Sequence, residues 1–237
     1  CNCVYFNSTF GKEYGEFTSP NWPSTYEKNT DCHLYKFTAK DDQIVEMSFN
    51  TFDVQKSSTD DCSKGDFVKL YLDVDSHTEI SEHSVWNTIL CGKLLPKWQQ
   101  RHYSTRSALI MEFRCDSSSN KYSSFSGKFR FINKSSFESD GELLSGTQCD
   151  YQFLSITMQG RRSGKFFSPD FPSNYPKNIR CAYHFMGKYN EKVKISFERI
   201  DLGNEDMRLI KRIFEFSHFS TTLHIKLRFK LIPLKQY

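Results

Sequence analysis

The sequence lacks the motifs of several common enzyme classes. It contains no His-Glu-x-x-His pattern for a catalytic zinc, no Gly-x-Ser-x-Gly turn for a serine nucleophile and no glycine-rich phosphate loop. The eight cysteines are scattered, apart from Cys1-Asn-Cys3, and none of them forms a Cys-x-x-Cys pair suited to zinc. These absences favour a non-enzymatic protein.

Long apolar stretches are also missing. No segment is long enough to span a bilayer as a helix, and neither a signal peptide nor a methionine precedes Cys1. We therefore expect a mature or excised piece whose membrane anchor, if there is one, lies outside these 237 residues. No stretch shows the period of an amphipathic helix, which favours β-structure.

Cysteines and glycosylation sequons indicate an oxidising, extracellular setting. Eight cysteines without metal-ligand spacing are typical of disulfide-bonded secreted or cell-surface proteins. Two acceptor sequons for N-linked glycans begin at Asn7 and Asn133. We expect glycosylation at these two asparagines and a location outside the cell or on its surface.

Residues 3–132 contain a series of short predicted strands. Apolar and polar residues alternate between turn-rich segments, and 22 phenylalanines and 12 tyrosines supply strand-forming side chains. The alternating stretches are 34–37, 44–49, 67–72, 108–113 and 127–131. This spacing predicts an all-β fold, an antiparallel β-sandwich.

An eighteen-residue phrase occurs twice. Residues 15–32 and 164–181 align without a gap and are identical at ten positions. The prolines of the phrase remove backbone donors, so it predicts an ordered turn whose aromatic residues, Trp22 and Tyr26 in the first copy, fold back onto the domain. A repeat this long predicts two similar domains in series.

The two copies continue unequally, because the second has no counterpart of Cys62, Cys91 or Asp66. We assign residues 1–132 to a complete first domain, 133–148 to a polar linker, 149–203 to the first half of a second domain and 204–237 to a divergent basic tail.

The tail carries an excess of positive charge. Residues 207–237 contain seven Lys or Arg against one acid. Strict alternation in residues 222–231 predicts a strand that does not match the first domain. This strand pattern and the extracellular setting argue against nucleic acid as a partner.

The repeated phrase resembles the opening of a CUB domain. The later Cys62-x-x-x-Asp66, Cys91-Gly92 and Ile110-Met-Glu-Phe113 also fall where that family has its landmarks. The resemblance covers residues 3–132 completely and residues 149 to 203 as a half-copy. It implies a two-sheet antiparallel jelly-roll that secreted and cell-surface proteins use for binding.

A closer likeness concerns Cys1-Asn-Cys3, Ser19-Pro-Asn-Trp22-Pro and the run from Gly65 to Gly92. These segments are similar to suppressor of lurcher proteins, which are CUB arrays. That likeness implies an auxiliary or clustering protein for an ionotropic glutamate receptor, at a synaptic membrane. Two alternatives stay open: a regulatory, substrate-recognising arm of a secreted astacin-like or complement-type protease, and a carbohydrate-binding secreted module.

The family resemblance also implies a disulfide pattern, in which the first two cysteines of a domain pair and the next two pair. This pattern gives Cys3–Cys32, Cys62–Cys91 and Cys149–Cys181. Cys1 could replace Cys3, but the Cys-x-Tyr sequence shared by residues 3–5 and 149–151 favours Cys3. Cys1 and Cys115 then remain, and we expect them to bridge.

The resemblance further implies a calcium site, since many CUB domains hold Ca²⁺ with one Glu and two Asp. Asp66 and Asp116 match the aspartates, whereas Gln55 stands at the glutamate position. An amide oxygen carries no charge, so we expect weak binding. The alternative is that these are polar loop residues that cap turns without a metal.

The stretch 96–103 mixes cations and aromatic residues outside the obvious strands. Trp98, Arg101 and Tyr103 are therefore candidates for binding another extracellular or membrane protein, because Trp, Arg and Tyr dominate interface hot spots. Alternatively, Trp98 packs beneath its own domain.

Overall fold

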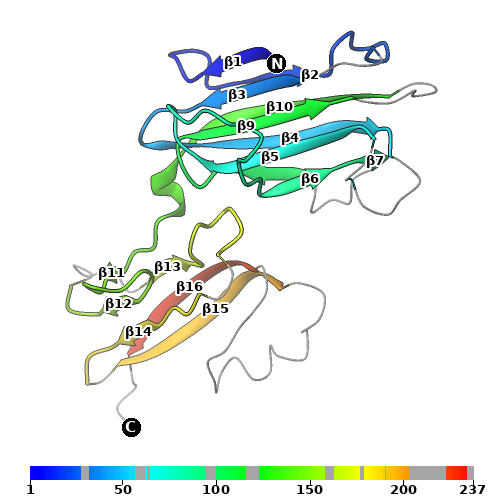
Figure 1. The fold of residues 1–237 in the computed structure, drawn as a ribbon. Helices are drawn as coiled ribbons and strands as arrows, with labels where there is room; N and C mark the ends of the chain where they lie inside the picture. Colours follow the sequence, from blue (N-terminus) through cyan, green and yellow to red (C-terminus); the bar gives the residue numbers. More distant parts are fainter. Residues whose placement is uncertain are drawn as a thin grey trace. The chain divides into compact units, whose positions relative to one another are not determined.

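The chain folds into two compact units of β-strands, Cys1–Lys134 and Ser135–Tyr237 (Figure 1). The computed structural model describes residues 1–27, 32–56, 62, 65–93, 100–115, 123–157, 163–176, 179–189, 191–202 and 223–233, and for 199–202 and 223–233 the backbone alone. The one helix among these residues is a short 3-10 helix, Lys134–Phe137. It is far too short to cross a membrane, and no other described segment qualifies as a spanning helix.

The first unit is a sandwich of two sheets. One sheet has the order β1-β3-β9-β5-β6, and the other has the order β2-β10-β4-β7 with β8 also paired to β4. β1 runs parallel to β3, whereas the other pairs are antiparallel. The strands are β1 (Asn2–Asn7), β2 (Tyr14–Thr18), β3 (His33–Thr38), β4 (Gln43–Val54), β5 (Phe67–Val74), β6 (Thr88–Leu90), β7 (Gly92–Lys93), β8 (Arg101–Tyr103), β9 (Ala108–Arg114) and β10 (Ser124–Asn133). The predicted all-β sandwich and its five strands are confirmed.

The core of the first unit is built from phenylalanine rings on alternate strand positions. Phe125 on β10 is fully buried, and its ring centroid lies 5.2 Å from that of Phe113 and 6.2 Å from that of Phe49. Phe17 and Tyr35 also contact it. Phe125 therefore packs against aromatic residues of both sheets, and each edge-to-face pair adds about 0.5–1.5 kcal/mol beyond area burial.

The repeated phrase adopts the same backbone in both units. Asn21 and Asp170 have φ angles of 61° and 57°, a left-handed conformation that Asn and Asp tolerate better than most residues. The Trp22–Pro23 and Phe171–Pro172 peptide bonds that follow are both cis. Tyr26 folds back as expected and is 3% exposed.

Trp22 folds back only in part. The residue is 38% exposed and belongs to the exposed large apolar residues of the first unit. The sequence pattern gave no means of separating the buried tyrosine of the phrase from the exposed tryptophan.

The second unit repeats one sheet of the first. Its strands β13 (Ser163–Phe167), β16 (Leu223–Pro233) and β15 (Glu191–Leu202) are ordered β13-β16-β15, like β2-β10-β4. Gly164 pairs with Phe229 as Gly15 pairs with Phe129. The tail expected to diverge from the first domain thus takes the place of its last strand.

The other sheet of the second unit has the order β11-β12-β14. β12 (Tyr151–Leu154) runs parallel to β14 (Tyr183–Met186), as β1 runs parallel to β3. Within the described part of this unit, no strand pairs with β14 on the side where β3 pairs with β9. The described residues of the second unit thus supply counterparts of β1 and β3 in this sheet, but none of β9.

Most of the segment expected to be a linker belongs to the second unit. β11 (Glu142–Leu143) pairs with β12, and the Asp140 carboxylate accepts a hydrogen bond of 2.7 Å from the Lys165 N–H. The domain boundary thus falls between Lys134 and Ser135. Polar composition predicted a linker here because it does not distinguish a solvated linker from a hydrogen-bonded turn.

The structure contains the Cys62–Cys91 and Cys149–Cys181 disulfides, but Cys32 pairs with Cys1 and not with Cys3. The parallel register decides this: Asn2 lies opposite His33, so Cys1 falls opposite Cys32 while Cys3 falls opposite Leu34.

The expected Cys1–Cys115 bridge is also wrong. β3 lies between β1 and β9, and a separation of two strands is about 10 Å, beyond the reach of a disulfide. Cys3 is exposed and Cys115 is buried, and both retain thiols.

Peptide mapping without reduction tests this arrangement. We expect the Cys1–Cys32, Cys62–Cys91 and Cys149–Cys181 peptides to migrate as linked pairs. An alkylating reagent should modify Cys3 in the folded protein and Cys115 only after unfolding, because burial protects the latter thiol. Recovery of a Cys3–Cys32 or Cys1–Cys115 pair would show that the strand register is different.

Candidate functional site

Three segments of the first unit meet at the hydroxyl of Tyr26. This hydroxyl donates a hydrogen bond of 2.7 Å to Asp66 Oδ2 and accepts one of 3.2 Å from the backbone N–H of Gln55. Tyr26 comes from the repeated phrase, Gln55 follows the end of β4, and Asp66 precedes β5. Burial raises the pKa of Tyr26 well above its usual value, so the hydroxyl stays protonated and can donate.

The oxygen atoms at this end of the sandwich are deeply placed. Asp66 is 0% exposed, and its backbone N–H donates a bond of 3.1 Å to the Gln55 carbonyl. The side-chain oxygen Oε1 of Gln55 is buried and has no hydrogen-bond partner among the described residues. A buried acceptor without a donor lowers the stability of the folded state by about 1–3 kcal/mol. A cation that this oxygen coordinates would remove that penalty.

Two of the three residues expected to hold calcium therefore come together, Gln55 and Asp66. The third, Asp116, lies outside the described residues, although β9 ends beside Asp66, since Arg114 pairs with Phe67. The described residues contain no group of three or more His, Cys, Asp or Glu placed to hold a metal. One carboxylate and one uncommitted amide oxygen fit a hard cation, but they do not make a complete site.

Sequence reasoning missed the part played by Tyr26, although the phrase contains a tyrosine in both copies. In the second unit the corresponding residue is Tyr175, and burial raises its pKa to about 12. Its hydroxyl has no hydrogen-bond partner among the described residues, and the sequence offers no counterpart of Asp66. The Tyr26–Asp66 bond is thus a feature of the first unit.

Replacing Tyr26 by Phe tests the importance of this bond. The change removes the hydroxyl, so the buried Asp66 carboxylate loses a hydrogen-bond donor and the Gln55 N–H loses its acceptor. We expect a loss of about 1–3 kcal/mol in unfolding free energy, measured by urea denaturation. Tyr175→Phe is the matched control and should change stability by less than about 0.5 kcal/mol. Equal effects of the two variants would contradict the assigned role.

A second buried carboxylate lies in the same unit. Glu46 on β4 is 5% exposed and contacts Arg130 on β10, whose Nε lies 2.6 Å from Glu46 Oε2. Arg101 Nε lies 3.4 Å and the Tyr103 hydroxyl 3.1 Å from Glu46 Oε1. Such a carboxylate is tolerated inside a protein because cations and donors surround it.

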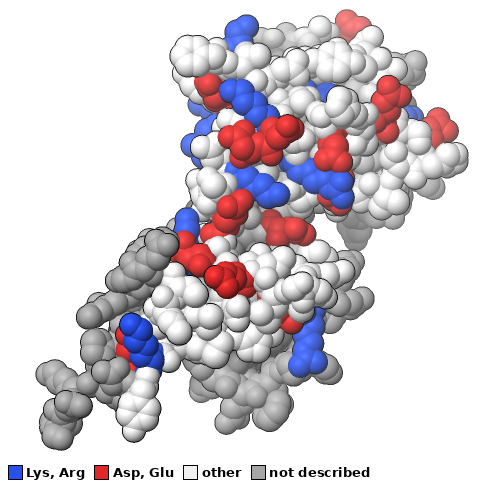
Figure 2. Space-filling view, turned by 90° about the vertical axis from the view of Figure 1, so that its left-hand side faces the viewer, with Lys and Arg blue, Asp and Glu red and all other residues white. Residues whose placement is uncertain are grey.

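This arrangement changes the view of the predicted partner-binding stretch. Arg101 and Tyr103 lie in the short strand β8 rather than in a loop, and both contact Glu46. Trp98 lies outside the described residues. On the face shown in Figure 2, acidic and basic side chains of the first unit are interspersed, in keeping with such pairs.

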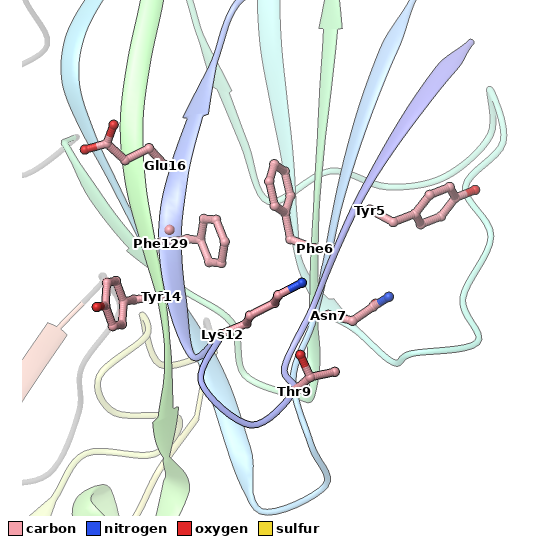
Figure 3. Close-up of a pocket in the computed structure, with 9 residues that line it drawn as sticks. Tyr5, Phe6, Asn7, Thr9, Lys12, Tyr14, Glu16 and Phe129 are labelled. Atoms are coloured by element: carbon pink, nitrogen blue, oxygen red, sulfur yellow. The ribbon is translucent and has the colours of Figure 1, made fainter.

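A pocket of about 430 Å³ opens between β1 and β2, where the edges of the two sheets part (Figure 3). Phe6 and Phe129 form its floor, with ring centroids 4.8 Å apart. Lys12 comes from the connecting loop, and Tyr14, 75% exposed, lies at the rim. The pocket has an aromatic base and a polar margin.

The two sequons occupy different surroundings. Asn7 is exposed at the end of β1 and lines the pocket, and Asn133 is exposed at the end of β10. Both are accessible to modification, and their glycosylation stays a prediction.

Comparison with known proteins identifies one family. The CUB domain model matches residues 3–129 and 149–216. Cubilin of Canis lupus familiaris is 26% identical over 198 residues, which are 84% of this chain and 5% of cubilin. Neuropilin-2 of Rattus norvegicus is 24% identical over 201 residues, 84% of this chain and 18% of that protein. Tolloid-like protein 2 of Homo sapiens is 24% identical over 217 residues, 83% of this chain and 20% of that protein.

Solved structures also match, at lower sequence identity. The CUB1-EGF-CUB2 domains of rat MASP-1 match with 16% identity and a TM-score of 0.44, covering 97% of this chain and 94% of that one. The MASP-1 CUB2 domain bound to Ca²⁺ matches with 19% identity and a TM-score of 0.41, covering 55% and 99%. The chain spans a fifth or less of the length of the three curated relatives above.

Proposed function

Because this chain belongs to the CUB domain family, we propose that it is an extracellular, non-enzymatic module that binds another protein and holds a weakly bound Ca²⁺ in its first unit. CUB domains are extracellular protein-interaction modules. Three disulfides support the extracellular setting, since such bonds persist in oxidising compartments. The calcium proposal rests on the uncommitted, buried Oε1 atom of Gln55 beside Asp66.

The chemistry of these residues favours a hard cation of low affinity. Ca²⁺ requires several oxygen ligands, and the charge of the ligands sets its affinity. Asp66 would supply a negative oxygen and Gln55 a neutral one, while Tyr26 orients the Asp66 carboxylate through its hydrogen bond. The neutral amide lowers the affinity to about the millimolar range found in extracellular modules. A bound cation would tie the chain after β4 to the start of β5.

Calcium titration with thermal melting tests this site. With a dissociation constant of about 1 mM, 10 mM Ca²⁺ adds roughly 1.4 kcal/mol of stability and raises the melting temperature by about 3–6 °C. Gln55→Glu should tighten binding roughly tenfold, because it restores the missing charge.

The matched control is Gln43→Glu, which adds the same charge where Gln43 accepts a hydrogen bond from Ser8. This variant should keep the calcium response of the unaltered chain. The site is refuted if Gln55→Glu melts at the same temperature with and without 10 mM Ca²⁺.

We further propose an ionotropic glutamate receptor as the partner class, with the chain acting as an auxiliary or clustering factor. The support is the sequence likeness of Cys1-Asn-Cys3 and of the run from Gly65 to Gly92 to suppressor of lurcher proteins. The exposed Trp22 and Trp86 offer aromatic side chains of the kind that interfaces use.

Binding of the purified chain to an immobilised receptor ectodomain tests this partner. We expect saturable binding that Trp22→Ala weakens at least tenfold, with Val85→Ala as a control at another exposed apolar residue. Absence of binding at micromolar concentration, together with capture by a protease substrate or on a glycan array, would support one of the alternative modules instead.

A further inference from the structure

The outer edge of β1 is open in the described structure. The Asn2 N–H donates to the Cys32 carbonyl at 2.9 Å and the Ser8 N–H to the Thr38 carbonyl at 2.8 Å, so the backbone groups of even-numbered residues face β3. Those of Cys3, Tyr5 and Asn7 face the other way, where no described strand pairs with β1. An edge of this kind pairs with foreign strands unless something covers it.

Two side chains stand together on one face of this edge strand. Tyr5 and Asn7 are two residues apart on one strand, so both project from the same face of β1, about 6.6 Å apart. Figure 3 shows both on one side of β1, with Phe6 on the other. Tyr5 is 63% exposed, and Asn7 is exposed. The amide of Asn7 has no hydrogen-bond partner within the described residues.

The ring of Tyr5 is accessible to a sugar on Asn7. Tyr5 is exposed, and its side chain shares one face of β1 with that of Asn7. An exposed aromatic face of this kind accepts the apolar C–H face of a sugar ring.

Asn7 begins the sequon Asn7-Ser8-Thr9. Ser8 is half-buried and donates to Gln43 Oε1 at 2.7 Å, whereas Asn7 and Thr9 are exposed. The side chain that accepts the glycan and the hydroxyl that completes the sequon are thus both at the surface.

We propose that an N-linked glycan on Asn7 packs its first N-acetylglucosamine against Tyr5 and covers the open edge of β1. In the transfer, Nδ2 of Asn7 bonds to the anomeric carbon of the sugar. The bond from that carbon to the diphosphate of a lipid-linked oligosaccharide breaks, and the amide nitrogen loses one proton.

The second sequon supplies an internal comparison. Two residues before Asn133 stands Phe131, which is 5% exposed and belongs to the core. A glycan on Asn133 therefore has no exposed ring at the position where Asn7 has Tyr5. Stabilisation by the first sugar should be specific to Asn7.

The experiment uses the full chain secreted from eukaryotic cells, with glycopeptide mapping of both sequons. Complete removal of the glycans by an amidase should lower the melting temperature by about 3 °C. Trimming to a single N-acetylglucosamine should preserve it. Asn7→Gln should show the full loss and Asn133→Gln none.

Tyr5→Ala, with Tyr5→Leu as a second variant in case the first does not fold, should abolish the dependence of the melting temperature on glycan removal. Sedimentation should show self-association of the Asn7→Gln chain but not of the glycosylated chain, because its strand edge is uncovered.

Three outcomes would overturn the proposal. The first is an unmodified Asn7, and the second is a glycan-dependent shift that persists in both Tyr5 variants. The third is uptake of an extended peptide at β1 by fully glycosylated protein, which would identify a partner strand as the occupant of this edge.

Discussion

The antiparallel register between the strand of the repeated phrase and the last strand of its unit is the constraint on which this structure depends. In the first unit Gly15 lies opposite Phe129 and Phe17 opposite Gly127. A Cβ atom at Gly15 would stand 2.7 Å from Phe129, and one at Gly127 would stand 2.3 Å from Phe17. Each ring therefore lies across a glycine of the neighbouring strand. This interlock positions the aromatic core, and with it Phe6 at the edge, whose ring stacks 4.8 Å from Phe37.

The second unit reproduces this register although its strand comes from a different sequence. Gly164 again faces a phenylalanine, Phe229, and the β-bulge recurs at the corresponding place, after Phe49 in β4 and after Phe197 in β15. Backbone pairing thus carries over even where side chains do not: Leu227 stands opposite Phe166, in the place that Gly127 has opposite Phe17. The strand of the phrase and the last strand of the unit thus pair in the same register in both units.

Strand identity and fold class could be predicted because alternation and turn composition are local properties. The choice between Cys1 and Cys3 could not be predicted, since the two are only two residues apart in the sequence. The register of β1 against β3, a non-local property, selects Cys1. The fate of Cys115 depends likewise on the order of strands in the sheet. The burial of Glu46 could not be predicted, because a glutamate in an alternating strand is typical of an outward-facing position. Its contacts with Arg130 and Tyr103 depend on strand pairing, which the sequence does not show. In the candidate calcium site, family likeness supplied Gln55 and Asp66, whereas the link through Tyr26 required the fold.

The loss of Asp66, Cys62 and Cys91 from the second copy is physically coherent. Asp66 is fully buried, which requires the chain between β4 and β5 to be held so that Tyr26 reaches the carboxylate. The Cys62–Cys91 disulfide joins that chain to the start of β7, which itself pairs with the end of β4 at Asp53 and Val54. Closing such a loop contributes about 3–4 kcal/mol. Without the disulfide, the chain that carries Asp66 would be less fixed, and burying the carboxylate without its hydrogen bond to Tyr26 would lower the stability of the fold. Without the carboxylate, the disulfide would have no buried polar group to hold in place. The two features are therefore expected to be kept or lost together, so the proposed calcium site has no equivalent in the second copy of the sequence.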